Sequence, residues 1–399
     1  MHWTLQNPPT AAAALDRLRR LDAARYAQTR NHLNGGVSAL SPYITHGLLR
    51  LPEAVSELPG GIDLPMSHKW LAELGWREFF RHVWAHAGDA ILTSMRPGIL
   101  PESAYSQEMP ADVLQGRTGV PAIDQAVYTL YTQGMLHNHA RMWLASYLIH
   151  VRRVHWRIGA DWMVAHLIDG DLASNHLSWQ WIAGTFSIKP YLFNADNVAR
   201  FAPTQWHSSG TEIDQNHETL TKWATHPGHR RSVDPRWPLA RQAIEPPALW
   251  HKPPPGLGVM EPDAAAIATL AGRDIALIHP WDLSGIPAPT TALRVGIYLK
   301  EHHTEWPWGE MRWRWVQQAM AHSSSQQWWV DAATLQQALR LTNGAHANHD
   351  LHIARHGLNL DWHPAPALFP NVKQACNSFS AWWKHASKGK KQARDLLSP

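Results

Sequence analysis

The chain has 399 residues, 44% of them apolar, which predicts two or three domains with sizeable cores. Its formal net charge of +4 permits a polyanionic partner such as a nucleic acid without requiring one. The single cysteine, Cys376, excludes a disulfide framework and the common cysteine metal sites. The sequence shows neither a signal-peptide pattern nor a long apolar run, which predicts a cytoplasmic protein that does not span a membrane.

The first 200 residues are predicted to be helical, because apolar residues recur at spacings of three and four and no alternating strand pattern occurs. Thr10, which follows Pro8 and Pro9, is typical of the N-cap of a helix and would open one that extends to about residue 30. Further helices are expected at residues 71–83, 122–130, 142–151 and 161–167.

A proline-rich segment at residues 226–264 marks a change in composition and is predicted to be an extended linker. Beyond it, strands are expected at residues 275–278, 293–299, 328–330 and 351–353, with helices at 310–320 and 332–341. This alternation predicts a small α/β unit with a parallel sheet, followed by a basic, mobile tail at residues 384–394. We therefore predict a mainly α protein with a helical domain over residues 1–225, a linker over 226–264 and a small α/β domain over 265–399.

One predicted helix carries an unusual set of side chains. Trp70, Glu73 and Trp76 are spaced by three and Arg77 follows, so all four share one helical face. A carboxylate between two indoles is costly to bury in its ionised form, so burial should raise the pKa of Glu73 and leave a neutral acid that can donate a hydrogen bond. The alternative is ordinary packing, with Glu73 and Arg77 as a solvated i,i+4 pair.

Two further stretches accompany this helix. Residues 38–43 have the sequence Ser-Ala-Leu-Ser-Pro-Tyr, and residues 137–142 have the sequence His-Asn-His-Ala-Arg-Met. The second stretch continues with Trp156, Asp169-Gly170-Asp171, Asn175, Trp179 and Trp181. In order and spacing across residues 20–205, the three stretches together resemble the helical flavin domain of the cryptochrome/photolyase family.

This resemblance implies a U-shaped FAD in the helical domain. Ser38, Leu40 and Ser41 would hold its diphosphate through hydroxyl and backbone N–H groups. Asn175 would face flavin N5, where an amide rather than an acid favours the fully reduced anionic flavin. The full set of implied cofactor-binding residues is Tyr26, Ser38, Leu40, Ser41, Trp70, Arg77, Asn138, Arg141, Asp169, Asp171 and Asn175.

The resemblance also implies a substrate and a reaction. The implied activity is blue-light-driven repair of cyclobutane pyrimidine dimers in DNA, a carbon–carbon lyase reaction in which FADH⁻ donates one electron to the flipped-out dimer and recovers it. The substrate-binding residues would be Glu73, Trp76, Asn138, Met142 and Trp181. Relatives that repair 6-4 photoproducts are expected to carry histidine where Asn138 and Met142 stand, so these two residues favour cyclobutane dimers.

The residues expected to carry the chemistry are Glu73, Asn175, Trp179 and Trp156. Trp179 and Trp156 match the inner two members of the family's electron-transfer chain. Residues 98–115 contain no tryptophan that could serve as the surface member, and Tyr105 is the nearest candidate.

The chain departs from the family pattern in three places. The flavin domain begins almost at Met1, which predicts a short form without the usual N-terminal antenna domain, or a permuted order in which residues 293–320 resemble that domain. No pigment-binding residue is identified, so an antenna pigment is not expected. His139 stands where an arginine often contacts DNA phosphate, and Val37 stands where a hydroxyl group often occurs.

These departures keep two other hypotheses open. One is a cryptochrome-like blue-light photoreceptor flavoprotein without repair activity, and the other is a flavoprotein with a different redox or nucleic-acid role in stress. We expect a monomer whose partner is DNA containing pyrimidine dimers. His346, His349, His352 and His356 could bind a metal on one helical face, but a strand there would scatter them, and we expect a polar surface and no metal.

Overall fold

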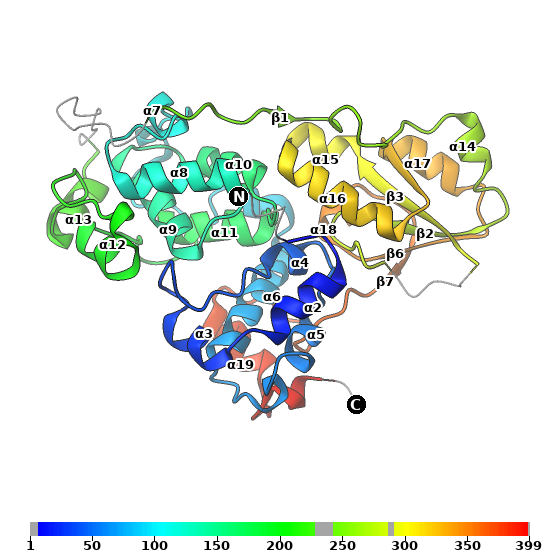
Figure 1. Cartoon of the computed structure of the whole chain (residues 1–399), viewed down its shortest axis with the longest axis horizontal. Helices are drawn as coiled ribbons and strands as arrows, with labels where there is room; N and C mark the ends of the chain where they lie inside the picture. Colours follow the sequence, from blue (N-terminus) through cyan, green and yellow to red (C-terminus); the bar gives the residue numbers. More distant parts are fainter. Residues whose placement is uncertain (1–6, 228–241, 286–290, 398–399) are drawn as a thin grey trace.

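The computed structural model describes residues 7–227, 242–285 and 291–397. Figure 1 shows a helical part, drawn in blue to green, beside an α/β unit drawn in yellow and orange. The predicted order of a mainly helical part followed by a small α/β unit is therefore confirmed.

The N-terminal helices pack together at the bottom of Figure 1. They are α2 (Ala11–Arg19), α3 (Ala23–Thr29), α4 (Ser41–Thr45), α5 (Leu51–Ser56) and α6 (Lys69–Ala87). Thr10 caps α2 as predicted, since its hydroxyl accepts a hydrogen bond from the Ala13 N–H at 3.2 Å. The prediction of one helix to residue 30 is wrong, because Asp22 accepts from the Arg25 N–H at 2.9 Å and begins a second helix.

A second group of helices follows. They are α7 (Ala111–Leu114), α8 (Pro121–Gln133), α9 (Asn138–Ser146), α10 (Trp156–His166), α11 (Leu172–Ala183), α12 (Ala195–Phe201) and α13 (His217–Thr225). The helix predicted at 142–151 is divided, because α9 ends at Ser146 and a π-helical turn (Tyr147–Val151) continues it. Short 3-10 turns occupy Gly61–Asp63, Gly88–Leu92, Glu102–Ala104, Thr204–Trp206 and Ala393–Leu396.

The α/β unit contains a five-stranded sheet in which every pairing is parallel, as predicted. Its strands are β2 (Asp274–Ile278), β3 (Leu293–Leu299), β5 (Gln326–Val330), β6 (Gly344–Asn348) and β7 (Asp361–His363), in the order β5-β3-β2-β6-β7. Its helices are α14 (Ala264–Ala268), α15 (Lys300–Glu305), α16 (Glu310–Ser323), α17 (Ala332–Leu339) and α18 (Leu351–Ala354). A two-residue strand of the linker region, β1 (Leu249–Trp250), pairs antiparallel with β4 (Trp308–Gly309).

The strand predicted at 351–353 is wrong, because these residues form α18. Asp350 caps this helix by accepting a hydrogen bond from the His352 N–H at 3.0 Å. His346 lies on β6 and His352 on α18, so the histidines of this region do not share one helical face. Within the described ranges, no group of three or more possible ligands gathers into a metal site.

The expectation of a mobile basic tail is also wrong. The last helix, α19 (Phe379–Ala386), lies among the N-terminal helices, where Figure 1 draws it in red beside blue α3 and α5. Beyond it, the Met66 N–H donates to the Lys391 carbonyl at 3.0 Å and the Ala393 N–H donates to the Leu64 carbonyl at 2.9 Å. The domain boundaries themselves remain predictions.

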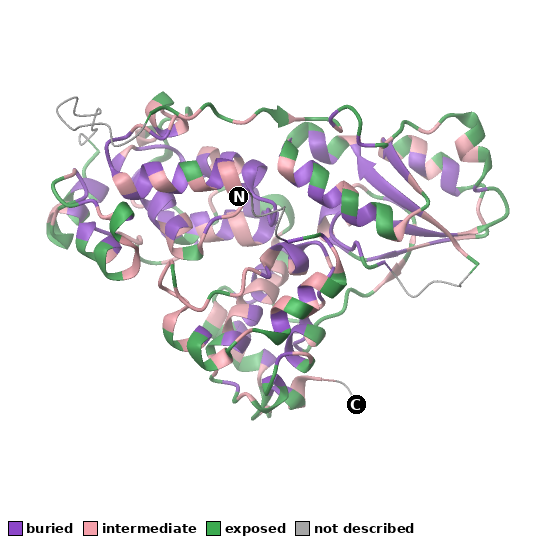
Figure 2. Cartoon of the chain, viewed as in Figure 1, coloured by how far each residue is buried: buried purple, intermediate pink, exposed green. Residues whose placement is uncertain are grey.

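Buried residues form two cores (Figure 2). One joins the N-terminal helices to the α/β unit, and the other lies within the second helical group. No helix in the described part of the chain combines the length and the apolar character that crossing a membrane requires.

Candidate cofactor and substrate site

A pocket of about 1170 Å³, its mouth included, opens between α4, α6, α9 and α11. Most predicted site residues line it: Tyr26, Ser38, Ser41, Trp70, Glu73, Trp76, Arg77, Asn138, Arg141, Met142, Asp169, Asp171, Asn175 and Trp179. Three do not, namely Leu40, Trp156 and Trp181.

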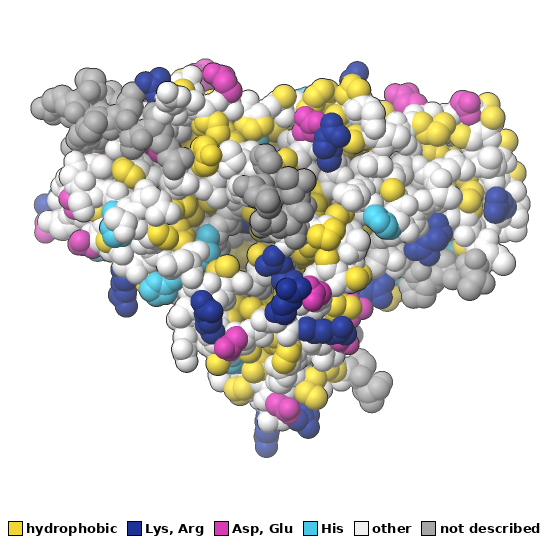
Figure 3. All heavy atoms as spheres, viewed as in Figure 1, with side chains coloured by type: hydrophobic (Ala, Val, Ile, Leu, Met, Phe, Trp, Pro, Cys, Tyr) yellow, Lys and Arg dark blue, Asp and Glu magenta, His cyan; other side chains and the backbone are white. Residues whose placement is uncertain are grey.

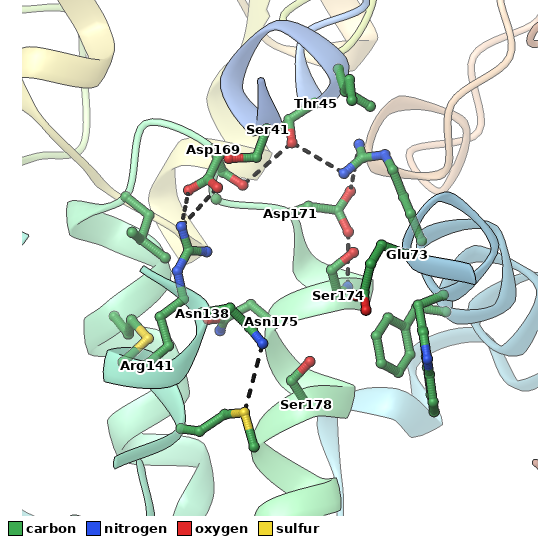
Figure 4. A pocket seen from close by; sticks show the side chains of 18 of the residues that line it. Ser41, Thr45, Glu73, Asn138, Arg141, Asp169, Asp171, Ser174, Asn175 and Ser178 are labelled. Carbon is green, nitrogen blue, oxygen red and sulfur yellow. Dashed lines mark hydrogen bonds and ion pairs between the residues drawn. The ribbon is translucent and has the colours of Figure 1, made fainter. Parts of the chain in front are cut away.

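A bidentate ion pair forms one wall. Arg141 Nη2 on α9 lies 2.9 and 2.8 Å from the two oxygens of Asp169, which follows α10 (Figure 4). Arg141 Nε also donates to the Leu136 carbonyl at 2.8 Å, which fixes the guanidinium plane. Two residues of the implied cofactor-binding set thus form an ion pair, although its place beside a flavin stays a prediction.

Asp171 is the most enclosed acid of the pocket, with 1% of its side chain exposed. It caps α11 through the Ser174 N–H at 2.8 Å. Its Oδ2 lies 3.0 Å from Arg81 Nη2 and 3.7 Å from Arg77 Nη2, both on α6. Burial opposes ionisation of Asp171, but these guanidinium groups hold its pKa below the ordinary value. Arg81 also binds Asp350 at 2.6 Å, so the charge network extends from the pocket into the α/β unit.

The segment before α4 shows how its serines reach the pocket. Ala39 has a φ of +50°, a left-handed conformation that L-residues seldom adopt and that occurs often at binding loops. Ser38 and Ser41 line the pocket, whereas Leu40 is fully buried and does not. Tyr26 is buried edge-on against Trp70 at 5.1 Å.

Glu73 differs from the expectation. Its side chain is 39% exposed, and its Oε1 lies 3.1 Å from Arg30 Nε. The expectation of an acid buried between two indoles is therefore wrong, since the carboxylate is partly exposed and is paired with Arg30. The alternative pairing with Arg77 is also wrong, because Arg77 binds Asp171 and donates to Thr45 Oγ1 at 3.1 Å.

Two amides on neighbouring helices face the cavity. Asn138 Nδ2 lies 3.6 Å from the sulfur of Met142, one turn along α9 (Figure 4). Asn175 Nδ2 donates to the Ala160 carbonyl at 2.9 Å, and its Oδ1 has no hydrogen-bond partner among the described residues. The acceptor atom of Asn175 is thus the one available to a ligand.

Some of the predicted aromatic site residues line the pocket, and others lie outside it. Trp179 lines the pocket and its ring lies close to α10, because a Cβ at Gly159 would be only 2.4 Å from it. Trp156 is buried and donates to Ser94 Oγ at 2.9 Å. His155 lies 5.7 Å from the Trp156 ring and 6.4 Å from the Tyr105 ring, which gives an aromatic path toward the surface. Trp181 lies outside the pocket, 37% exposed.

Several polar residues that the sequence did not predict also line the pocket, among them Thr45, Ser174 and Ser178. Thr45 could have been found, because it closes the short helix that Ser41 opens. The hydroxyl of Ser174 is buried and has no hydrogen-bond partner among the described residues, so it can bind a ligand atom. Hydroxyls, an arginine and a buried unpartnered donor suit a ligand with phosphate and hydroxyl groups, so the donor set fits FAD.

The α/β unit also reaches this site. Arg312 on α16 is buried and donates to the Gly170 carbonyl at 2.6 Å, between the two aspartates. A Cβ at Gly170 would lie 2.5 Å from Arg312 Nη1 and from the Val164 carbonyl, which explains why glycine stands there. The guanidinium carbon lies 4.0 Å from the centre of the Trp308 ring, and burial lowers the pKa of Arg312 to about 9.

Two of the three departures from the family pattern, His139 and Val37, lie near the pocket residues in sequence. His139 Nδ1 donates to the Asn31 carbonyl at 2.6 Å and its ring packs against Trp143 at 5.7 Å, so it anchors a loop. Val37 is 39% exposed beside Ser38.

A family model described as the FAD binding domain of DNA photolyase matches residues 70–227. The deoxyribodipyrimidine photo-lyase of Escherichia coli (strain K12) is 33% identical over 232 residues, 55% of this chain and 47% of that protein. That of Streptomyces griseus is 36% identical over 165 residues, 41% of this chain and 35% of that protein. The chain thus spans less than half the length of these curated relatives.

Among solved structures, an archaeal photolyase from Sulfolobus tokodaii with two FAD molecules aligns at a TM-score of 0.43 and 24% identity, covering 57% of this chain and 53% of that chain. FAD is the cofactor of the matching domain family. Residues 70–227 therefore match the FAD binding domain of DNA photolyase, and the chain is similar to deoxyribodipyrimidine photo-lyases over that region.

Proposed function

We propose that the chain is a deoxyribodipyrimidine photo-lyase, which repairs cyclobutane pyrimidine dimers in DNA under blue light with FADH⁻. The observation that carries this proposal is one shared pocket. Glu73, Trp76 and Met142 line the same cavity as the implied cofactor residues. The curated relatives that bear this activity support the same conclusion.

In this proposal the polar wall holds the cofactor. Ser38, Ser41 and Ser174 would bind its phosphate and hydroxyl groups, and the Arg141–Asp169 pair would border the flavin. The acceptor oxygen of Asn175 would receive a hydrogen bond from a flavin N–H. The chemistry supplied by the bound cofactor is the reversible donation of one electron to the lesion under blue light.

The protein's own part in the reaction is to bind and orient the lesion. Trp76 and Met142 would supply an apolar surface for the flipped bases. Glu73, ion-paired with Arg30, would accept a hydrogen bond from a base N–H rather than donate one to a carbonyl. Asn138 would complete the lining beside Met142.

DNA is the proposed partner, and the surface charge is compatible with it. Figure 3 shows Lys and Arg side chains gathered over α2 and its neighbours on the viewed face. Helix α2 contributes Arg17 and Arg19, and Arg20 follows it. Binding to this surface should weaken as salt rises, because counterions released from the phosphates oppose association.

The test is repair in a cuvette. The flavin-loaded protein is mixed with a dimer-containing oligothymidine under reductant without oxygen, and the nucleobase absorbance band is followed under blue light and in darkness. Light-dependent recovery of that band supports the proposal. Flavin that photoreduces without recovery would favour the photoreceptor hypothesis, and a protein without flavin would overturn both.

A further inference from the structure

The C-terminal segment, residues 364–397, is fastened to α6 by directed hydrogen bonds. The carboxylate of Glu78 accepts from the backbone N–H groups of Leu368 and Phe369 at 2.6 and 3.1 Å. One turn further, His82 Nε2 accepts from the Cys376 N–H at 3.2 Å. These contacts join positions that are almost 300 residues apart in the sequence, and they fix the chain that leads into α19.

Helix α19 then packs its aromatic side against the same helix. Gly75 permits this close approach, since a Cβ there would lie 2.5 Å from the Trp383 ring. Trp382 is buried, with its ring 6.1 Å from that of Phe79 on α6. Ser378 caps α19 by accepting from the Ala381 N–H at 3.2 Å, so the first residue of the helix, Phe379, is held in place.

Phe379 lies face to face with Trp76. The ring centroids are 4.1 Å apart and the planes differ by 9°, the closest and most parallel ring contact that Trp76 makes with a described residue. Trp76 lines the pocket and Phe379 does not. The phenyl ring therefore supports the indole from outside the cavity.

We infer that Phe379 is a positioning residue for substrate recognition, fixing the plane of Trp76 so that a flipped pyrimidine can stack on it. This inference rests on the proposed function. Trp76 is only partly buried, and a partly exposed indole without a ring behind it can adopt other rotamers. A parallel aromatic partner restricts the indole before the substrate binds, so less conformational freedom is lost on binding.

The test variant is Phe379→Leu, which keeps an apolar side chain but removes the ring. The matched control is Phe369→Leu, which makes the same change in the same segment. The Phe369 ring contacts Trp382 and Trp383 instead of Trp76. Phe379→Tyr restores an aromatic ring. Each variant is measured alone and with Trp76→Ala. The main readout is the Kd for a dimer-containing oligothymidine in darkness, which reports binding without turnover.

A second readout does not depend on DNA. Protein containing 5-fluorotryptophan gives a fluorine NMR resonance for each indole, and Trp76→Phe identifies the one that belongs to Trp76. Thermal unfolding of every variant confirms that it is folded.

We expect Phe379→Leu to weaken dark binding about 3- to 10-fold, to shift or broaden the Trp76 resonance, and to have no further effect on binding in the Trp76→Ala background. Phe379→Tyr should bind as the original protein does, and Phe369→Leu should leave both readouts unchanged. Unchanged binding in folded Phe379→Leu would overturn the inference, as would an equal loss with and without Trp76.

If the original protein does not prefer dimer-containing over undamaged oligothymidine, the proposed function fails and the substrate role of Phe379 fails with it. In that case the fluorine spectrum separates the two failures, because it still reports whether Phe379 orders the Trp76 ring.

Discussion

Arg30 Nε lies 3.1 Å from Glu73 Oε1, so this acid of the pocket lining is paired with the residue that follows α3 rather than with Arg77 on its own helix. The position of Arg30 is fixed in turn, because His137 Nε2 donates to its carbonyl at 3.0 Å. Burial, together with neighbouring His139, lowers the pKa of His137 to about 4, which keeps this ring neutral at physiological pH. A carboxylate held in this way is oriented before the substrate arrives.

Replacing Glu73 with alanine should therefore reduce repair while the flavin remains bound. Loss of a charge-assisted hydrogen bond costs about 1.5–3 kcal/mol, which corresponds to roughly a tenfold to hundredfold weaker interaction with the lesion. The measurement is repair per absorbed photon, with flavin absorbance as the check on cofactor content. Glu57→Ala is the matched control, because the Glu57 side chain is also 39% exposed and is paired with Arg19 at 2.6 Å. Equal repair by both variants would remove Glu73 from the site.

The sequence predicted which residues line this site better than it predicted their hydrogen-bond and ion-pair partners. Trp70, Glu73 and Arg77 share a face of α6 because helical spacing dictates it, and all three line the pocket. The partners Arg30 and Arg312 come from other elements, and no local pattern indicates which side chains tertiary packing will bring together.

The errors in secondary structure have a similar origin. A Leu-His-Ile run fits a strand as well as a helix, and the N-cap signal of Asp350 decides between them. The basic residues of the C-terminal segment suggested a solvated tail, although its aromatic residues are the part that packs on α6.

The network around Asp171 should contribute strongly to stability. Asp171→Asn removes the negative charge between Arg77 and Arg81, and breaking one side of a buried ion pair typically costs about 3–5 kcal/mol. Urea unfolding of the flavin-free protein measures this loss without a contribution from the cofactor. Asp16→Asn is the control, since Asp16 forms an exposed pair with Arg20 and should cost less than about 1 kcal/mol. A similar free energy of unfolding for both variants would contradict the prediction.

Glu78 should make the stability depend on pH. Burial raises its pKa from 4.5 to about 7, although the Leu368 and Phe369 N–H groups favour the ionised form. Between these two values the folded protein keeps a proton that the unfolded chain has lost, so this group lowers the free energy of unfolding as pH rises. The effect is at most about 3 kcal/mol between pH 4.5 and pH 7.

Glu78→Gln tests this directly, because glutamine cannot ionise. The stability of the variant relative to the original protein should increase from pH 5 to pH 8, as measured by urea unfolding at several pH values. Glu57→Gln controls for the removal of one negative charge. A relative stability that does not change across this range would show that Glu78 is ionised on both sides of it.

The path for reduction of a resting flavin can be tested one ring at a time. Trp179 lines the pocket, and His155 stands between the Trp156 and Tyr105 rings, at 5.7 and 6.4 Å. Phenylalanine is far harder to oxidise than tryptophan or tyrosine, so Trp179→Phe and Trp156→Phe should nearly abolish light-dependent flavin reduction. Tyr105→Phe should slow it, because the electron would lose its entry point near the surface. The measurement is the decay of the oxidised flavin band under blue light with an external reductant. The control is Tyr128→Phe, at a residue 42% exposed on α8.

Slow reduction in both tryptophan variants with an unchanged rate in Tyr105→Phe would mean that the electron enters through another residue. Repair by protein that has already been reduced chemically should be unaffected by Tyr105→Phe, because that reaction returns its electron and needs no external donor.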